Sequence, residues 1–441
     1  MTPGRPRPPG SGIGLGAVGA ARSATVRHHP VRATGTGWHH LARPIHLPPQ
    51  LLHRIAARGS LESPWLAAGL AAVVVASAAV AVVRFRRRRR EGVQVRHRGL
   101  RRAALAGWLA ALTVLGALAG LNAYVGYIPT VPGLLGALPA DPPGTRHPSR
   151  IETLAIGDPA LDVRPGTAYI YLPPGYDDRS NAARRYPVVY LLHGYPGSAI
   201  DWFRGAEVRW VMNTMIAERL VQPMIVVAPD ASGGWLHDSE MLNQSGGPQV
   251  EDYLTGTVVR VIDARYRTVA DRSGRAIGGV SSGGYGALNL GLRHQDTYSV
   301  ILSEMPYGDP GAVTRTLLGG SRAEWLANAP SHYIPTMTFR QPMVVDLLAG
   351  TRDPQEFEAR RLGRMLTSRG QAALFTEVPG ATHTWRGARA ETPYALAFAS
   401  QYLAGRRPPR GGTVTRQVRA ASPKRAGLDG PIPTRLRPAQ L

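Results

Sequence analysis

The sequence predicts an α/β protein with a mostly parallel central sheet and helices on both faces, preceded by two transmembrane helices. From residue 151 onward, short apolar runs alternate with amphipathic stretches, which is the β/α pattern of such a sheet. Two of these runs, "PVVYLL" and "PMIVVAP", are continuously apolar, as expected for strands covered on both faces. Two long uncharged segments before residue 130 predict the membrane helices.

The first element in chain order is a basic N-terminal segment, residues 1–63, for which we expect disorder because Pro, Gly, Arg and His dominate without a hydrophobic period. Residues 64–83 carry no charge, and 20 helical residues are long enough to cross a hydrocarbon core of about 30 Å. Residues 103–128 form a second uncharged segment. Its candidate interfacial anchors are Trp108, Tyr124 and Tyr127.

Between the two spans, residues 84–102 contain ten arginines and one glutamate, which predicts a cytoplasmic loop. Both ends of the chain then lie outside the cytoplasm. Residues 129–150 are a Pro/Gly linker, residues 151–405 form the α/β domain, and residues 406–441 are expected to be a disordered basic tail.

Within the domain, the hydrophobic pattern locates the individual elements. We expect strands at residues 151–156, 167–172, 187–192, 223–228, 275–279, 299–303, 342–348 and 372–377. We expect helices at residues 206–219, 250–266, 283–293, 354–369 and 391–404.

The chain has a net charge of +23, but the basic excess lies outside the domain. Residues 151–405 contain 23 arginines against 25 carboxylates, so the domain is not expected to bind nucleic acid. The basic ends make the lipid bilayer and anionic cell-envelope polymers the candidate partners. The chain has no cysteine, which excludes disulfides, thiolate metal sites and a cysteine nucleophile, and no metal or cofactor motif is visible.

The segment "GVSSG", residues 279–283, fits the pattern G-x-S-x-G, which places a nucleophilic serine on a strained turn between a strand and a helix. It follows the strand "RAIGG" and opens the helix "SGGYGALNLGLRH", as the motif requires. Only Ser281 has glycine two residues before and two residues after it. A structural glycine turn is the alternative, and a dinucleotide loop fits less well because the glycines do not follow the order G-x-G-x-x-G.

A serine nucleophile needs a histidine base, which follows it in the chain in this architecture. His383 is the leading candidate because "VPGATHTWRG" lies between a strand and the last helix, where a loop reaches the strand ends. His332, in the irregular "APSHYIP", is the alternative, and His294 falls at a helix end.

Asp353 is the leading candidate for the acid that orients the histidine, because it lies just past the end of a strand. Its alternative role is a helix N-cap ahead of Pro354. Asp346 lies within the strand, and Glu356 and Glu377 are further alternatives.

The loop in "YLLHGYPGSAIDWF" is expected to supply one oxyanion donor, the backbone N–H of Tyr195. The second donor is the backbone N–H of Ser282. His193 precedes the nucleophile, so a structural or substrate-lining role is expected for it. Trp202, with Asp201, is expected to close the loop and is a further substrate-lining candidate.

These segments resemble a family of α/β hydrolases that includes esterase D, bacterial feruloyl esterases and mycolyltransferases. The matching segments are "YLPPGY", "PVVYLLHGYPGSAIDW", "VVAPDAS", "RAIGGVSSGGYGAL", "LAGTRDP" and "PGATHTW". The resemblance implies a triad of Ser281, Asp353 and His383, with oxyanion positions at Tyr195 and Ser282. The family usually has Met where this chain has Ser282, a position that acts through its backbone. The segment "LNAYVGYIPT" resembles membrane-anchored actinobacterial members.

The function expected from these observations is that of a membrane-anchored, extracytoplasmic serine esterase that cleaves a carboxylic ester through an acyl-enzyme. The alternative is a mycolyltransferase-like acyltransferase that moves the acyl group to an envelope sugar or lipid hydroxyl. A catalytically silent envelope-binding scaffold is the second alternative.

Overall fold

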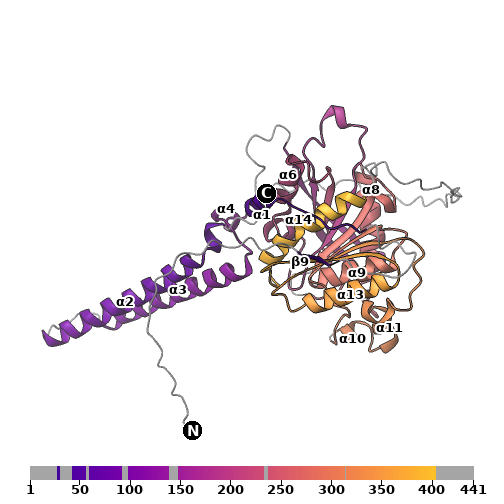
Figure 1. Cartoon of the computed structure of the whole chain (residues 1–441). Helices are drawn as coiled ribbons and strands as arrows, with labels where there is room; N and C mark the ends of the chain where they lie inside the picture. Colours follow the sequence, from indigo (N-terminus) through magenta and orange to yellow (C-terminus); the bar gives the residue numbers. More distant parts are fainter. Residues whose placement is uncertain are drawn as a thin grey trace, which may run out of the picture.

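The computed structural model describes residues 27–29, 42–55, 59–91, 98–138, 148–232, 237–312 and 314–403. In these residues a nine-stranded sheet carries helices on both faces, and two long helices project away from it (Figure 1). The mostly parallel α/β architecture predicted above is confirmed. The predicted tail, residues 406–441, lies outside the described residues.

The sheet has the strand order β1-β9-β8-β7-β6-β4-β5-β3-β2. Strands β4 to β9 are mutually parallel, whereas β1, β2 and β3 pair antiparallel at the two edges. All eight strands expected between residues 151 and 377 are present. The strands are β1 (Arg27–His29), β2 (Arg150–Asp158), β3 (Val163–Leu172), β4 (Val188–Leu192), β5 (Ile225–Ala228), β6 (Arg275–Val280), β7 (Val300–Glu304), β8 (Val344–Gly350) and β9 (Ala372–Val378).

Each face of the sheet has its own hydrophobic core, because successive side chains of a strand point to opposite faces. In β7, Ile301 packs into one core, and its neighbours Val300 and Leu302 pack into the other. The first core is covered by α8 (Val259–Arg265), α9 (Ser282–Arg293) and α13 (Glu356–Ser368), and the second by α6 (Val208–Ala217) and α14 (Trp385–Tyr402) (Figure 1). Covered on both faces, the central strands are continuously apolar, as the sequence predicts.

The N-terminal segment differs from the disorder predicted for residues 1–63. Helix α1 (Pro49–Ile55) packs against α6 and α14, with Leu51 and Ile55 buried. Strand β1 pairs with β9 at the sheet edge. The apolar residues of this segment are too few to fold alone, so its composition predicted disorder, but they complete the core formed by the later helices. Residues 42–48 and 59–63 are described as well, whereas residues 1–26, 30–41 and 56–58 lie outside the described residues.

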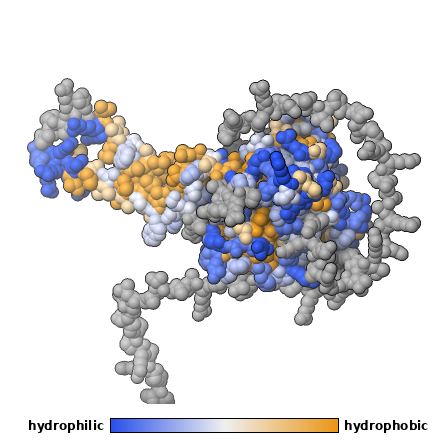
Figure 2. Space-filling view, turned by 90° about the horizontal axis from the view of Figure 1, so that it is seen from above, coloured by the Kyte–Doolittle hydropathy of each residue, from blue (hydrophilic) through white to orange (hydrophobic). Residues whose placement is uncertain are grey.

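The two predicted membrane segments form the long helices α2 (Pro64–Arg90) and α3 (Arg98–Val125), which pack against each other. Both are long and apolar enough to cross a membrane. Apolar surface covers much of the projecting pair, and the end far from the sheet is hydrophilic (Figure 2). Helix α2 continues through the arginines that were predicted to belong to a loop, because arginine favours helix once one has started.

Candidate active site

Ser281 lies on the turn between β6 and α9, at the carboxyl edge of the sheet. Its backbone has φ 58°, which is the positive-φ conformation of a strained strand-to-helix turn. The two flanking glycines permit this turn: a Cβ on Gly279 would lie 2.1 Å from the Gly283 oxygen, and a Cβ on Gly283 would lie 2.1 Å from the Leu192 oxygen. A side chain at either position would therefore displace the serine.

Three predicted side chains, from three different loops, form one hydrogen-bonded chain. His383 Nε2 lies 2.8 Å from Ser281 Oγ. His383 Nδ1 lies 3.1 Å from each carboxyl oxygen of Asp353. The Asp353 side chain is fully buried, while that of His383 is 31% exposed. A carboxylate beside Nδ1 favours the tautomer in which Nδ1 carries the proton, which leaves Nε2 free to accept the serine proton.

Packing between two loops brings the acid and the base together. Asp353 follows β8 and His383 follows β9, which are adjacent parallel strands. A Cβ on Gly350 would lie 2.1 Å from the Ala381 oxygen, so the two loops are in direct contact. Asp353 also accepts a hydrogen bond from the N–H of Gln355 at 2.7 Å. The N-cap of α13 is Gln355, so Asp353 stabilises the turn before the helix rather than capping it.

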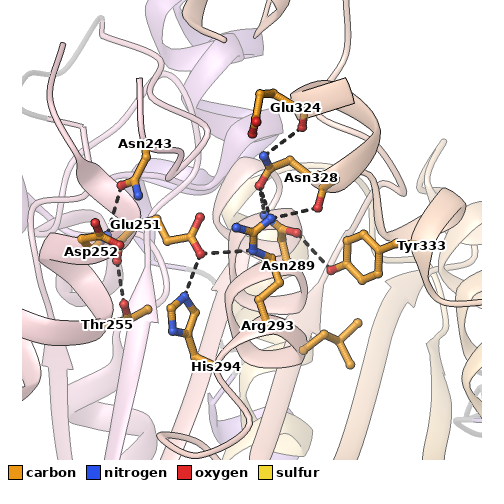
Figure 3. A network of polar contacts seen from close by, with 12 residues as sticks. Asn243, Glu251, Asp252, Thr255, Asn289, Arg293, His294, Glu324, Asn328 and Tyr333 are labelled. Carbon is orange, nitrogen blue, oxygen red and sulfur yellow. Dashed lines mark hydrogen bonds and ion pairs between the residues drawn. The ribbon is translucent and has the colours of Figure 1, made fainter. Parts of the chain in front are cut away.

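The alternative histidines lie elsewhere. His294, at the far end of α9 from Ser281, contacts Glu251 Oε1 at 2.7 Å. Figure 3 shows that Arg293 approaches the same carboxylate, so this histidine belongs to a separate polar network. His332 is exposed on the short helix α12 (Pro330–Tyr333). Neither contacts Ser281 within the described residues.

The alternative acids also have other partners. Asp346 is buried in β8, where it accepts a hydrogen bond from Thr376 Oγ1 at 2.8 Å. Burial raises the pKa of Asp346 well above its ordinary value, because a buried site disfavours the charged form. Glu356 and Glu377 both pair with Arg360.

The two predicted oxyanion donors flank Ser281. Ser282 is the first residue of α9, where a backbone N–H has no partner within the helix. The loop after β4 passes beside the nucleophile, because a Cβ on Gly194 would lie 3.4 Å from Ser281 Cβ. Tyr195 follows in this loop and is 43% exposed. Among the described residues, neither the Tyr195 nor the Ser282 N–H has a hydrogen-bond partner.

His193 and Trp202, which the sequence made candidates for lining the substrate, are both buried. His193 Nε2 accepts from the Ala231 N–H at 3.2 Å, and its Nδ1 lies 2.9 Å from the Gly194 oxygen. Trp202 packs edge-on against Trp385. Both side chains are therefore packed inside the domain, where they hold neighbouring loops in position. Their burial does not fit a substrate-lining role.

The sequence did not single out Glu240, which lies in the loop after β5 at the same edge of the sheet. Both of its carboxyl oxygens contact the hydroxyl of Tyr307, at 2.5 and 2.6 Å. Tyr307 in turn stacks on Tyr285 in the first turns of α9, with ring centroids 5.1 Å apart. Burial, together with the nearby Asp238, raises the pKa of Glu240 to about 8. An acidic residue in a polar loop gives no local signal of such burial.

The variant Glu240→Gln is expected to weaken the pH dependence of stability between pH 4.5 and about 8. The folded-state pKa lies above the ordinary value, so the stability linked to this proton is complete below pH 4.5 and is lost as pH rises through about 8, by at most ~5 kcal/mol. Thermal unfolding in detergent across this range measures the effect. The buried Glu304 and Glu391 also have raised pKa values, so a slope will remain. Parallel curves for the two proteins would contradict the prediction.

The fold and the serine-centred geometry together define an α/β hydrolase. A family model described as "Putative esterase" matches residues 163–399, more than half of the chain. The chain therefore belongs to this esterase family. No group of three or more His, Cys, Asp or Glu side chains in the described ranges is arranged to hold a metal ion.

Curated relatives and a solved structure are similar to the same part of the chain. An uncharacterized protein of Corynebacterium glutamicum is 26% identical over 238 residues, which cover 51% of this chain and 55% of that protein. An esterase of Mycobacterium tuberculosis is 29% identical over 167 residues, which cover 38% of this chain and 32% of that protein. The chain thus spans about a third of one relative and just over half of the other. A ferulic acid esterase structure has a TM-score of 0.52 and 22% identity, covering 59% of this chain and 100% of that chain, and it supports the fold.

Proposed function

We propose that this protein is a membrane-anchored serine esterase that cleaves a carboxylic ester through an acyl-enzyme. The observation that carries the proposal is the hydrogen-bonded chain from Ser281 through His383 to Asp353. Membership of the esterase family supports an ester substrate. The names of the relatives and the structural neighbour, which include esterases, agree with this class.

In the proposed mechanism, Ser281 Oγ attacks the ester carbonyl carbon while His383 Nε2 takes its proton. Asp353 holds the ring and stabilises the imidazolium that forms. The carbonyl oxygen becomes an oxyanion, which the N–H groups of Tyr195 and Ser282 bind. His383 then gives its proton to the leaving alcohol. Water, activated by the same histidine, attacks the acyl-enzyme and releases the acid.

For the membrane arrangement, we propose that α2 and α3 cross the bilayer as a hairpin, with the catalytic domain extracytoplasmic. The arginines Arg87, Arg88, Arg89 and Arg90 cluster at the end of α2 far from the sheet, which by the positive-inside rule favours a cytoplasmic turn. The segment before α2 packs on the domain through α1 and β1, so both flanks of the hairpin lie on one side. A cysteine introduced at Asp177, on the domain, should react with an impermeant maleimide in intact cells, and failure to react would contradict this topology.

Fluorophosphonate labelling of the full-length protein tests the nucleophile. Trypsin cleavage after Arg275 and Arg293 leaves both candidate serines in one peptide, and its fragment masses locate the adduct. We expect the adduct on Ser281, no labelling of Ser281→Ala, and labelling of Ser282→Ala, because alanine keeps the backbone N–H. An adduct on Ser282, or labelling that survives Ser281→Ala, would overturn the proposal. Product analysis with and without an acceptor alcohol separates hydrolysis from acyl transfer.

A further inference from the structure

The domain-side ends of the two long helices are joined to each other by hydrogen bonds. The side-chain amide of Asn122, near the end of α3, donates to the carbonyl oxygens of Leu61 at 3.0 Å and Ile128 at 2.8 Å. The Ile128 N–H donates back to Asn122 Oδ1 at 2.8 Å. Leu61, three residues before α2, and the residues after α3 are therefore joined through Asn122 into one connected unit.

From this unit, Tyr127 reaches the loop that contains the proposed oxyanion donor. Its hydroxyl donates to Asp201 Oδ1 at 2.5 Å, and Asp201 is only 3% exposed. The other carboxyl oxygen of Asp201 accepts from the Ser198 N–H at 2.7 Å. A Cβ on Gly197 would lie 2.7 Å from that same oxygen, so the loop packs tightly on the carboxylate. Tyr195 lies two residues further back in this loop.

A second set of contacts joins the same unit to α14, which begins two residues after His383. Arg389 Nη2 donates to the Gly126 oxygen at 2.6 Å and lies 2.9 Å from Glu62 Oε1. Arg389 and Glu62 are 2% and 1% exposed. Charged groups buried this deeply persist only when paired, so these contacts are integral to the fold.

The segment after the Tyr195 loop also packs against the start of α14, which follows the loop that carries His383. Trp202, which follows Asp201, packs edge-on against Trp385 with ring centroids 5.8 Å apart. Arg389 Nε donates to the Gly205 oxygen at 2.9 Å. The Ser198 contacts of Asp201 lie within the loop itself, whereas the Tyr127 hydroxyl fixes the same carboxyl group from outside the loop and so helps to hold the loop in one orientation.

We infer that Tyr127 is a positioning residue of the active site: through Asp201 it orients the loop that carries the Tyr195 N–H. The segment that follows α3 then contributes to catalysis as well as joining the proposed membrane helices to the domain. This inference rests on the proposed esterase function. The sequence made Tyr127 a candidate membrane-interface anchor, but the structure directs its hydroxyl into the domain.

The test compares Tyr127→Phe with Tyr124→Phe in the full-length protein in detergent. Tyr124 is a matched control because it lies on α3 one turn earlier and is 62% exposed. Fluorophosphonate titration counts the competent sites, and kcat is expressed per titrated site. Loss of a hydrogen bond to a carboxylate predicts a roughly ten-fold lower kcat for Tyr127→Phe, with KM within about two-fold. Tyr124→Phe should match the wild type.

A double variant tests whether Tyr127 acts through Asp201. Adding Asp201→Asn to Tyr127→Phe should lower kcat by less than the product of the two single effects.

A purely structural role for Tyr127 would lower the titrated fraction and the unfolding temperature but leave kcat per titrated site unchanged, and that result would overturn the inference. Equal losses in both tyrosine variants would also overturn it. A wild type that neither labels nor turns over an ester would instead refute the proposed function. An active wild type with a fully active Tyr127→Phe would refute the positioning role alone.

Discussion

Ser281→Ala is expected to lower kcat for ester cleavage by about 10⁵-fold or more, because the acyl-enzyme can no longer form. The folded structure should persist, since alanine fits the space of serine and the hydroxyl contacts only His383 in the described structure. Turnover of a chromogenic ester by the purified full-length protein measures the loss.

The adjacent serine provides the control for this prediction. Ser282→Ala should keep most of the turnover, because the proposed role of Ser282 belongs to its backbone N–H. Near-wild-type turnover by Ser281→Ala, in a preparation free of other esterases, would show that the nucleophile has been misassigned.

Asp353→Asn is expected to lower kcat by about 10⁴-fold with little change in KM. The asparagine amide can donate to His383 Nδ1, which favours the tautomer with the proton on Nε2. That nitrogen then cannot accept the proton of Ser281. Steady-state kinetics measured with the wild type in parallel give the two constants separately.

Asp346→Asn is the matched control for the acid. Asp346 lies in the preceding strand, where burial raises its pKa well above the ordinary value, and asparagine is an uncharged side chain of nearly equal shape. It should retain turnover within about three-fold, as expected of a residue outside the reacting groups. A large loss in Asp346→Asn together with an active Asp353→Asn would reverse the two assignments.

The sequence predicted the fold well because the relevant signals are local. Continuous apolar runs marked the central strands, and long uncharged runs marked the projecting helices. Spacing of the glycines around Ser281 identified the strand-to-helix turn, since each glycine lies where a side chain would collide with backbone. Such patterns depend on neighbours along the chain and need no knowledge of distant contacts.

The sequence says least about residues whose environment is made by distant segments. The segment before residue 63 has the composition of a disordered chain, but its few apolar residues are buried by α6 and α14. For His193 and Trp202 the sequence left open a structural or a substrate-lining role, and their burial fits the structural role. Nothing near Glu240 in the chain indicates that it would be buried against Tyr307.

By itself, then, the sequence determined the order of strands and helices, the two apolar helices and the position of Ser281 on its turn. The sequence ranked His383 and Asp353 first among their alternatives, but only the tertiary structure brings His383 to Ser281, 102 residues away along the chain, and Asp353 to His383. It also decided that Tyr127, 74 residues from Asp201, contacts the domain. Hydrophobic periodicity determines local structure, whereas contacts over such separations depend on how the packed sheet and helices place their loops.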